Sequence, residues 1–193
     1  AVLGWAFGLG VKTAFSVLLH TLVCQPPALT QSNVIVQLFS QDTKETKTCR
    51  SFSYPPYVDI RDQNTVFAGV MAHNLAMVGI GDRGNTRRTF ADIVSANYFS
   101  VLGVQPAQGR GFLPEGEKPG SSAAVAVVSY SYWKKQGLNP ALLGSTITVN
   151  SRPLTVVGIM PEGFTGTMQI FAPEVWVPLG MHDALENDFQ TSQ

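Results

Sequence analysis

The chain opens with an apolar run over residues 1–24, which Gln25, Pro26 and Pro27 bring to an end. A membrane-spanning helix needs about 20 mostly apolar residues, so this run is long enough. Its one charged residue is Lys12, which costs roughly 2.5–3.5 kcal/mol at the centre of a bilayer and less beside a protein neighbour. The prolines remove backbone donors and force an extended backbone. We therefore expect the end of a membrane-spanning helix that projects from the domain with a broad apolar surface.

Two other interpretations of the run fail on the residues present. A phosphate loop needs a glycine directly before its lysine and another five residues earlier, where Val11 and Ala6 stand. A signal peptide needs basic residues before its apolar part, whereas Lys12 lies inside it. A buried helix of a soluble domain remains the alternative to a membrane span.

Charge is scarce and unevenly distributed along the chain. Charged residues make up 13% of it, about half the usual share of roughly 25%. Between Thr13 and Thr43 there is no Lys or Arg, which is typical of the non-cytoplasmic side of a membrane. The net charge of zero and the pI of about 7.0 argue against a nucleic-acid partner. One small basic group is interpreted as the solvated end of a hairpin: Arg83, Arg87 and Arg88.

The residues that follow predict an α+β domain. Pro55 and Pro56 suit the first turn of a helix that continues to about Asn64. The glycine-rich residues 79–86 predict a hairpin connection. Because hairpins and helices alternate irregularly, a regular βαβ array is not expected. The predicted strands cover residues 33–39, 69–79, 87–94, 123–128 and 175–179.

Two serines are predicted to cap helices. Ser95 would begin a helix over residues 96–102, and Ser129 one that runs to residue 136. Asn139 and Pro140 predict one further helical turn, and residues 105–120 a long loop. Alternation on both sides of Asn150 and Ser151 predicts an antiparallel hairpin. The alternation predicts that Thr146, Thr148, Thr155 and Val157 share one face of the hairpin, or else that the residues between them do.

Residues that could carry chemistry are present but not arranged for it. The three histidines, His20, His73 and His182, do not have metal-ligand spacing. Ser129 does not have the flanking glycines of a nucleophile elbow, so it is interpreted as a helix cap. Cys24 and Cys49 are not spaced for a metal, and whether they pair is left open.

The acidic and glycine-rich groups are interpreted in the same way. Two carboxylate pairs have solvated neighbours, Asp59 with Asp62 and Glu115 with Glu117. The glycines of residues 109–112 are too few to hold a phosphate and are expected to let the backbone turn. We therefore predict no enzyme activity, no cofactor, and no catalytic, cofactor-binding or metal-binding residue.

Several stretches together resemble a known family. "VSANYFSVLGVQPAQGRGF" at residues 94–112 resembles the signature of the MacB-like periplasmic core domain of FtsX-type ABC transporter permeases, and residues 125–161 are similar to the segment that follows it. Residues 13–27 look like the end of the family's first transmembrane helix, and residues 52–70 like its first extracytoplasmic helix. The closest likeness is to the large permeases that contain two such modules. Lys12 departs from the family, which usually carries Asn or a small residue there.

The resemblance implies a domain organisation. Residues 1–27 would be the C-terminal part of the first transmembrane helix, and residues 28–95 the first half of a mixed α/β lobe. Residues 96–193 would form a helix, a loop and a mostly β second lobe with the antiparallel hairpin, incomplete at its C-terminus.

The resemblance also implies a function. The domain would lie on the extracytoplasmic side of the bacterial inner membrane and transmit ATPase-driven conformational change without catalysing a reaction. Its partners would be the membrane, an ABC ATPase subunit acting through the rest of the permease, and a second copy or second permease module. The alternatives are a membrane-anchored binding module and a secreted hydrolase. A hydrolase would require Ser129, His73 and Asp59 to converge in one pocket.

Overall fold

The computed structural model describes residues 35–38, 40–41, 49–50, 53–81, 84–121, 123–167 and 171–185. The apolar run of residues 1–24, with Lys12, His20 and Cys24, lies outside the described residues, as does Arg83. The membrane span therefore stays a prediction, and the pairing of Cys24 with Cys49, which the sequence left open, involves a residue outside the described ranges. None of the helices within the described ranges combines the length and the apolar character needed to cross a membrane.

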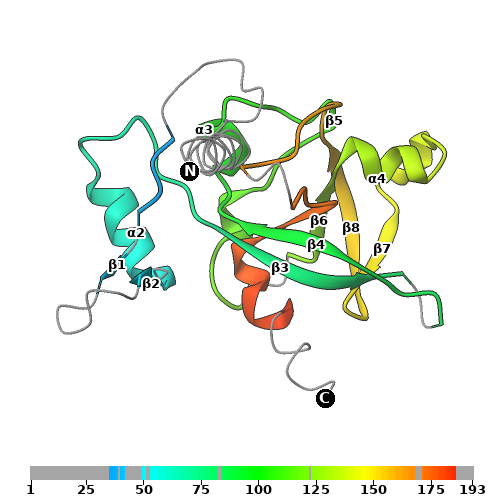
Figure 1. Cartoon of the computed structure of the whole chain (residues 1–193), viewed down its shortest axis with the longest axis horizontal. Coiled ribbons are helices and arrows are strands. Elements are labelled where there is room, and N and C mark those ends of the chain that lie inside the picture. Colours follow the sequence, from blue (N-terminus) through cyan, green and yellow to red (C-terminus); the bar gives the residue numbers. More distant parts are fainter. Residues whose placement is uncertain are drawn as a thin grey trace, which may run out of the picture.

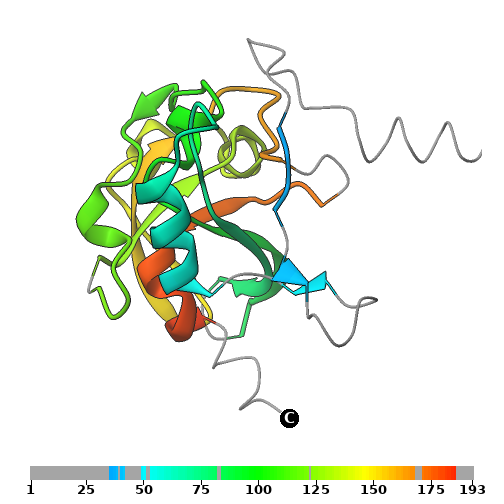
Figure 2. The ribbon, with the colours of Figure 1, turned by 90° about the vertical axis from the view of Figure 1, so that its left-hand side faces the viewer.

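Seven of the described strands form one sheet that closes on itself (Figures 1 and 2), and β1 (Ser40–Gln41) and β2 (Cys49–Arg50) form a separate two-stranded sheet. Hydrogen-bonded neighbours follow one another in a ring, β8-β6-β9-β4-β3-β7, and β7 pairs again with β8. The short β5, Gln108–Gly109, extends the sheet beside β8. A closed sheet leaves few unpaired edges, which limits unwanted strand pairing. The ring consists of β3 (His73–Ile80), β4 (Arg87–Val94), β6 (Val125–Val128), β7 (Thr146–Val149), β8 (Arg152–Ile159) and β9 (Val175–Pro178).

The predicted hairpins account for two neighbouring pairs in this ring. β3 and β4 pair antiparallel from His73↔Val94 to Ile80↔Arg87. β7 and β8 pair antiparallel across Asn150 and Ser151, both of which have positive φ. Two such residues match the type I′ turn, whose twist suits a hairpin. Both predicted hairpins are therefore confirmed.

Alternation along the strands separates an inner core from an outer core. The inner core takes alternate residues of all six ring strands, such as Ile93, Val128, Leu154 and Val177. Tyr132, Leu142 and Leu185, which lie outside the ring strands, are buried in the same core. Thr146, Thr148, Thr155 and Val157 are exposed or half-buried, whereas the residues that alternate with them are buried, so the predicted sharing of one hairpin face is confirmed.

The outer core lies on the opposite face of β4, β6 and β9. Val94, Val127 and Trp176 are buried there at 0% exposure. They are covered by α3, Tyr98–Val101, and by residues 102–112. Because three strands are buried on both faces, they read in the sequence as continuous apolar runs such as "VAVV" and "VWVP".

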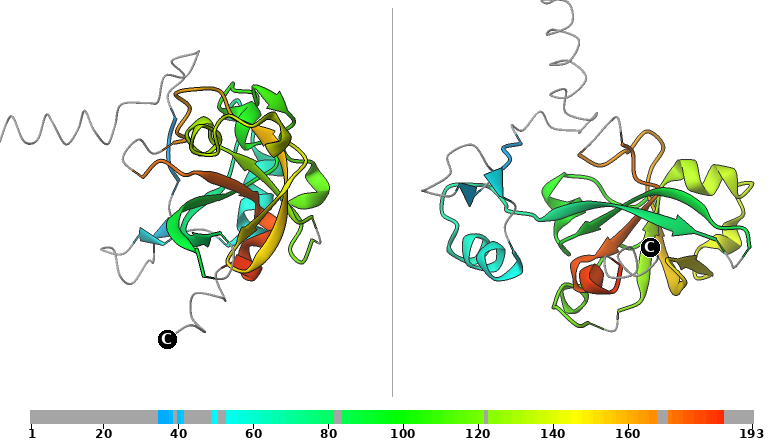
Figure 3. Two further views of the ribbon diagram at one scale, coloured as in Figure 1. Left: turned by 90° about the vertical axis from the view of Figure 1, so that its right-hand side faces the viewer. Right: turned by 60° about the horizontal axis from the view of Figure 1, so that its bottom comes forward.

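Three helical predictions are confirmed. α2 spans Tyr54–Gln63 with proline in its first turn. α4 spans Tyr130–Lys135, and the Ser129 side chain accepts a hydrogen bond from the Tyr132 N–H. Residues Pro140–Leu142 form a 3₁₀ turn capped by Asn139. Figure 1 and the right panel of Figure 3 show α2 beside the barrel and α4 at the opposite end.

Two predictions near strand ends are wrong. Residues 35–38 of the predicted strand 33–39 are irregular, and Ile35, Val36 and Leu38 are exposed. β-branched residues favour a strand only where another strand supplies backbone partners, and residues 35–38 have no ladder. The neighbouring Ser40–Gln41 pairs, among the described strands, with Cys49–Arg50 and not with the ring.

The second error concerns Ser95. The helix begins after Asn97, and Ser95 still continues the β3–β4 ladder through the hydrogen bond from its N–H to the Ala72 carbonyl, 2.9 Å. Its hydroxyl accepts from the Ala72 N–H instead of capping a helix. The local sequence could not reveal this competing use of the hydroxyl.

Other boundaries shift without changing the architecture. The strand predicted from residue 69 begins at His73, and the loop predicted over residues 105–120 contains β5 and a 3₁₀ turn, Pro114–Gly116. The described residues contain both helices and strands, as predicted for an α+β fold. Strands from residues 28–95 and from residues 96–193 both belong to the ring. The division of the chain near residue 95 stays a prediction.

Candidate functional site

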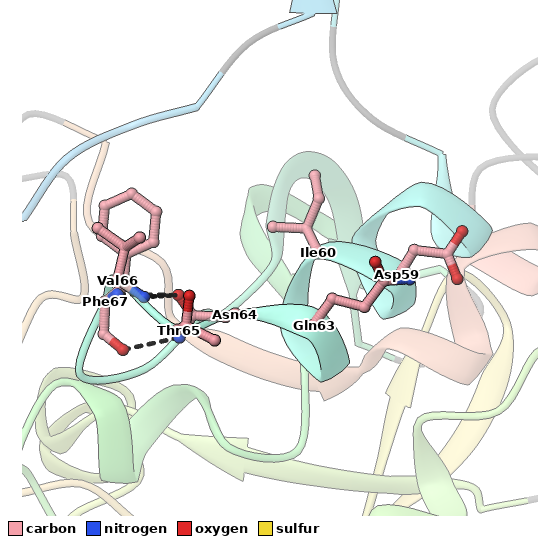
Figure 4. Close-up of a pocket in the computed structure, with 7 residues that line it drawn as sticks. All are labelled: Asp59, Ile60, Gln63, Asn64, Thr65, Val66 and Phe67. Carbon is pink, nitrogen blue, oxygen red and sulfur yellow. Dashed lines mark hydrogen bonds between the residues drawn. The ribbon is translucent and has the colours of Figure 1, made fainter.

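A hollow on the surface of the domain lies at the C-terminal end of α2 (Figure 4). It encloses about 340 Å³ and combines a carboxylate, two side-chain amides and apolar groups. Asn64 shapes it: its side-chain oxygen accepts from the N–H groups of Val66 and Phe67, at 3.1 and 2.8 Å. This turn leaves Val66 83% and Phe67 38% exposed. The lining residues are Asp59, Ile60, Gln63, Asn64, Thr65, Val66 and Phe67.

The other face of α2 contacts the barrel through the Arg61–Glu117 ion pair and carries the buried ring of Tyr57. Arg61 Nη1 donates to Glu117 Oε1 at 2.5 Å, where the Glu117 side chain is only 5% exposed. Arg61 Nε also contacts the exposed Asp62 at 2.8 Å. Of the α2 residues, only Tyr57 is buried, with the Arg61 guanidinium 5.5 Å from its ring centre. The hydrogen bond to Asp62 raises the pKa of Arg61 above its usual value, and Glu117 adds to this.

Glu117 also binds the turn between β4 and α3. Its second oxygen accepts from the Ala96 N–H at 2.9 Å. In the same turn, Ser95 holds Ala72 through its backbone and hydroxyl, and Asn97 Nδ2 donates to the Val70 carbonyl at 2.8 Å. The turn of residues 95–97 therefore fixes both Glu117 and the connector between α2 and β3.

A second buried carboxylate, Asp92, lies on the outer face of β4. It is 2% exposed, and its two oxygens contact His73 Nδ1 at 3.2 Å and the Tyr98 hydroxyl at 3.1 Å. Burial alone would lower the pKa of His73, but the hydrogen bond and charge of Asp92 raise it overall. Burial, and then Asp92, raise the pKa of Tyr98. This cluster ties β3, β4 and α3 together.

A third buried carboxylate, Glu174, lies just before β9. It contacts Arg87 of β4 and Lys135 of α4. Burial alone would raise its pKa, but the hydrogen bonds from the two cations lower it below the usual value. Arg87, predicted to be solvated, is therefore partly engaged, with its guanidinium also 5.9 Å from the Tyr132 ring centre.

The residues that a hydrolase would need are not brought together. The Ser129 hydroxyl binds Ser131 and the Tyr132 N–H, His73 binds Asp92, and Asp59 is exposed on α2. His182 contacts Asn74 and Asp183. In the described part of the chain, no group of three or more His, Cys, Asp or Glu side chains could hold a metal ion.

The family-like glycines have a steric role. Gly109 of β5 pairs with Gly158 of β8, and Gly109 has a φ of +75°. A Cβ at Gly109 would lie 2.2 Å from the Val157 carbonyl oxygen, and one at Gly158 would lie 2.4 Å from that of Arg110. The two glycines therefore permit the close approach of the strands, in agreement with the predicted conformational role of residues 109–112.

The interpretation of Glu117 as a solvated loop group is wrong, because the residue is 4% exposed. Glu115 beside it is exposed. Nothing in the local sequence separates these two glutamates; Arg61, the partner of Glu117, lies 56 residues away along the chain. Asp92 could have been found, since it interrupts the apolar strand "FADIV".

Comparison with known sequences now identifies the class of domain. A sequence profile of the MacB-like periplasmic core domain matches residues 1–193. The chain therefore belongs to the MacB-like periplasmic core domain family, which confirms the resemblance. The match supports an extracytoplasmic domain of a MacB-like or FtsX-like ABC transporter permease.

Two solved structures share the fold. The periplasmic region of MacB from Actinobacillus actinomycetemcomitans aligns with a TM-score of 0.57 and 16% identity, over 74% of this chain and 63% of that chain. The extracellular domain of the noncanonic ABC-type transporter YknZ from Gram-positive bacteria aligns with a TM-score of 0.58 and 17% identity, over 77% and 74%. The chain thus spans less than two thirds of the MacB region. No significant match to a curated protein sequence was found.

Proposed function

We propose that this domain transmits ATPase-driven conformational change in an ABC transporter permease and catalyses no reaction itself. The observation that carries the proposal is the match of the family profile to the whole chain. The arrangement of the described residues is compatible with a lever, because a closed barrel with two buried cores moves as a unit. A peripheral helix, α2, joins that unit through few groups.

The proposed partners follow from the family. An ABC ATPase subunit would act through the rest of the permease, and a second copy or a second permease module would complete the assembly. The domain would lie on the extracytoplasmic side of the bacterial inner membrane. Two surface hollows of the domain could receive such partners. One lies beside α2, and the other, of about 350 Å³, lies between α4 and β7.

The first experiment tests the side of the membrane. Gln136 is exposed at the end of α4, so a Gln136→Cys variant of the full-length permease, with Cys24 and Cys49 replaced by Ser, offers one accessible thiol in this domain. A membrane-impermeant maleimide added to intact spheroplasts should label it. Labelling that occurs only after lysis would contradict the extracytoplasmic placement.

The second experiment tests transmission. Spin labels at Gln136→Cys in two copies or modules of the permease, reconstituted with its ATPase in nanodiscs, report the distance between the two barrels. We expect the distance distribution to differ between the nucleotide-free state and the state trapped with ATP and vanadate. An ATPase variant that cannot bind nucleotide is the control. Identical distributions in all states would contradict transmission and favour the alternative of an anchored binding module.

A further inference from the structure

We propose that Glu117 is a positioning residue that couples α2 to the segment leaving the barrel after β9. The inference rests on the proposed function, because it assigns to two elements the movement that the domain transmits. It begins from the position of Glu117 in the fold. One of its oxygens is held by Arg61 of α2 and the other by the Ala96 N–H, while its side chain is almost fully buried.

The attachment of α2 depends strongly on this one carboxylate. A charge-assisted hydrogen bond is roughly twice as strong as a neutral one, and a buried carboxylate that loses its cation is left uncompensated. Tyr57 is the one buried residue of α2. An element with few buried apolar contacts opens locally at lower free energy than the core. Glu117 therefore sets how firmly α2 stays docked.

The loop that carries Glu117 also supports the C-terminal exit of the barrel. A Cβ added to Gly180 would lie 2.5 Å from the carbonyl oxygen of Gly116 and 2.4 Å from that of Lys118. These are the two residues that flank Glu117 in the chain. A Cβ at Gly116 would also be 3.4 Å from Pro178. The backbone on both sides of Glu117 is thus packed against residues 178–180.

The contacts define a short mechanical path. It runs from Arg61 on α2 to Glu117, through the backbone of residues 116–118, to the 3₁₀ turn Leu179–Met181 and the helical residues 182–185. Close packing transmits displacement because a dense interior does not compress. A shift of α2 would consequently move residues 116–118. Through the contacts of Gly180, it would also move residues 179–185, which we call the exit segment. Figure 1 shows α2 and the exit segment on neighbouring sides of the barrel.

The test uses hydrogen exchange of the full-length permease with its ATPase in nanodiscs. Arg61→Gln breaks the pair from its more exposed side, where the Arg61 side chain is 31% exposed, so the barrel stays folded. Unchanged exchange in β6 confirms this. We expect α2 amides to exchange about tenfold faster in the variant. Asp62→Asn is the matched control, because it removes only the exposed partner of Arg61. Arg61→Lys keeps the charge and should restore part of the protection.

The decisive measurement is the nucleotide response. In the wild type, trapping with ATP and vanadate should change exchange in both α2 and residues 179–185. In Arg61→Gln the response of residues 179–185 should be lost while that of α2 persists. A merely structural role would leave that response in place. Glu117→Gln should give the same pattern as Arg61→Gln.

The outcomes separate the two proposals. If the wild type responds and the response of residues 179–185 survives in Arg61→Gln, the coupling is wrong and the proposed function stands. If the wild type shows no nucleotide response in either segment, the proposed function fails. In that case faster exchange of both α2 and residues 179–185 in Arg61→Gln still supports the coupling. Faster exchange of α2 alone overturns it.

Discussion

The barrel and α2 are held in place by different means. In the barrel, alternate residues of six strands fill the inner core, and Trp176, Val127 and Val94 lie in the outer core with 0% exposure. In α2, one residue of the helix is buried, and among the described residues one ion pair, Arg61 with Glu117, joins the helix to the barrel. The right panel of Figure 3 shows the helix beside the barrel, apart from the strands.

The barrel and α2 therefore differ in the free energy that holds each of them in place within one domain. Apolar burial contributes roughly 25 cal/mol per Å² and makes the barrel cooperative. α2 contributes little apolar area, so its docking depends on directed polar contacts that can be made and broken. An element of the second kind can change position without unfolding the first.

The largest expected effect is in the outer core. Trp176→Ala should lower the free energy of unfolding by about 3–5 kcal/mol, because it removes a fully buried ring that packs against Phe99 and Phe164. Urea denaturation followed by circular dichroism measures it. Val66→Ala beside α2, where the side chain is 83% exposed, is the matched control and should change stability by less than about 0.5 kcal/mol. Equal effects of the two variants would remove the contrast.

A smaller effect is expected where the hairpin closes the ring. Asn150 accepts from the Gly79 N–H at 2.7 Å and donates to the Leu185 carbonyl at 3.0 Å. Asn150→Gly preserves the positive φ of 46° but removes both contacts. We expect a loss of about 1–3 kcal/mol, since the partly buried Gly79 N–H and Leu185 carbonyl lose these hydrogen bonds. Asn139→Gly, which removes a local cap of an exposed 3₁₀ turn, should cost less than half as much. If Asn150→Gly lowered the free energy of unfolding by less than Asn139→Gly does, the side chain of Asn150 would not stabilise the closure of the ring.

The loss of stability at acid pH tests whether the ion pairs of Glu174 stabilise the barrel. Its folded-state pKa is lowered, so the stabilisation is present above the unfolded-state pKa of about 4.3 and is lost as pH falls through the folded-state pKa. The urea midpoint of the wild type should therefore fall more steeply below about pH 5 than that of Glu174→Gln. Exchange measured at β9 assigns the change to the barrel rather than to α2. Parallel curves for the two proteins would mean that the Arg87 and Lys135 contacts stabilise nothing measurable.

The smallest effect is expected at Ser151, which has a φ of +62° in the β7–β8 turn. Ser151→Gly removes left-handed strain of about 1–2 kcal/mol, and glycine in the unfolded chain offsets roughly 0.5–1 kcal/mol of this. A net gain of about 0.5 kcal/mol should therefore appear as a higher thermal midpoint. Exchange of α2 should remain unchanged, since the turn does not touch it. A loss of stability would show that the serine makes a contact worth more than the strain.

Much of the fold could be predicted from local patterns. The α2, α4 and hairpin predictions are confirmed because their signals are short-range: prolines in a first turn, a serine cap, and strict alternation around Asn150. The family resemblance was also readable, since Gly109 and Gly158 stand in stretches typical of it. The steric need for glycine at these two positions follows from the close approach of β5 and β8, which the local sequence does not show.

The family, the α+β class and the elements whose signals lie within a few residues could all be predicted from the amino-acid sequence. Only the tertiary structure decided the closure of the ring, the role of Ser95 and the burial of Glu117. The physical reason is the same in each case. A hydroxyl or carboxylate takes whichever partner the folded chain brings near, and Arg61 reaches Glu117 across 56 residues of sequence. Residues 35–38 show the converse, because a strand-like sequence without a neighbouring backbone forms no strand.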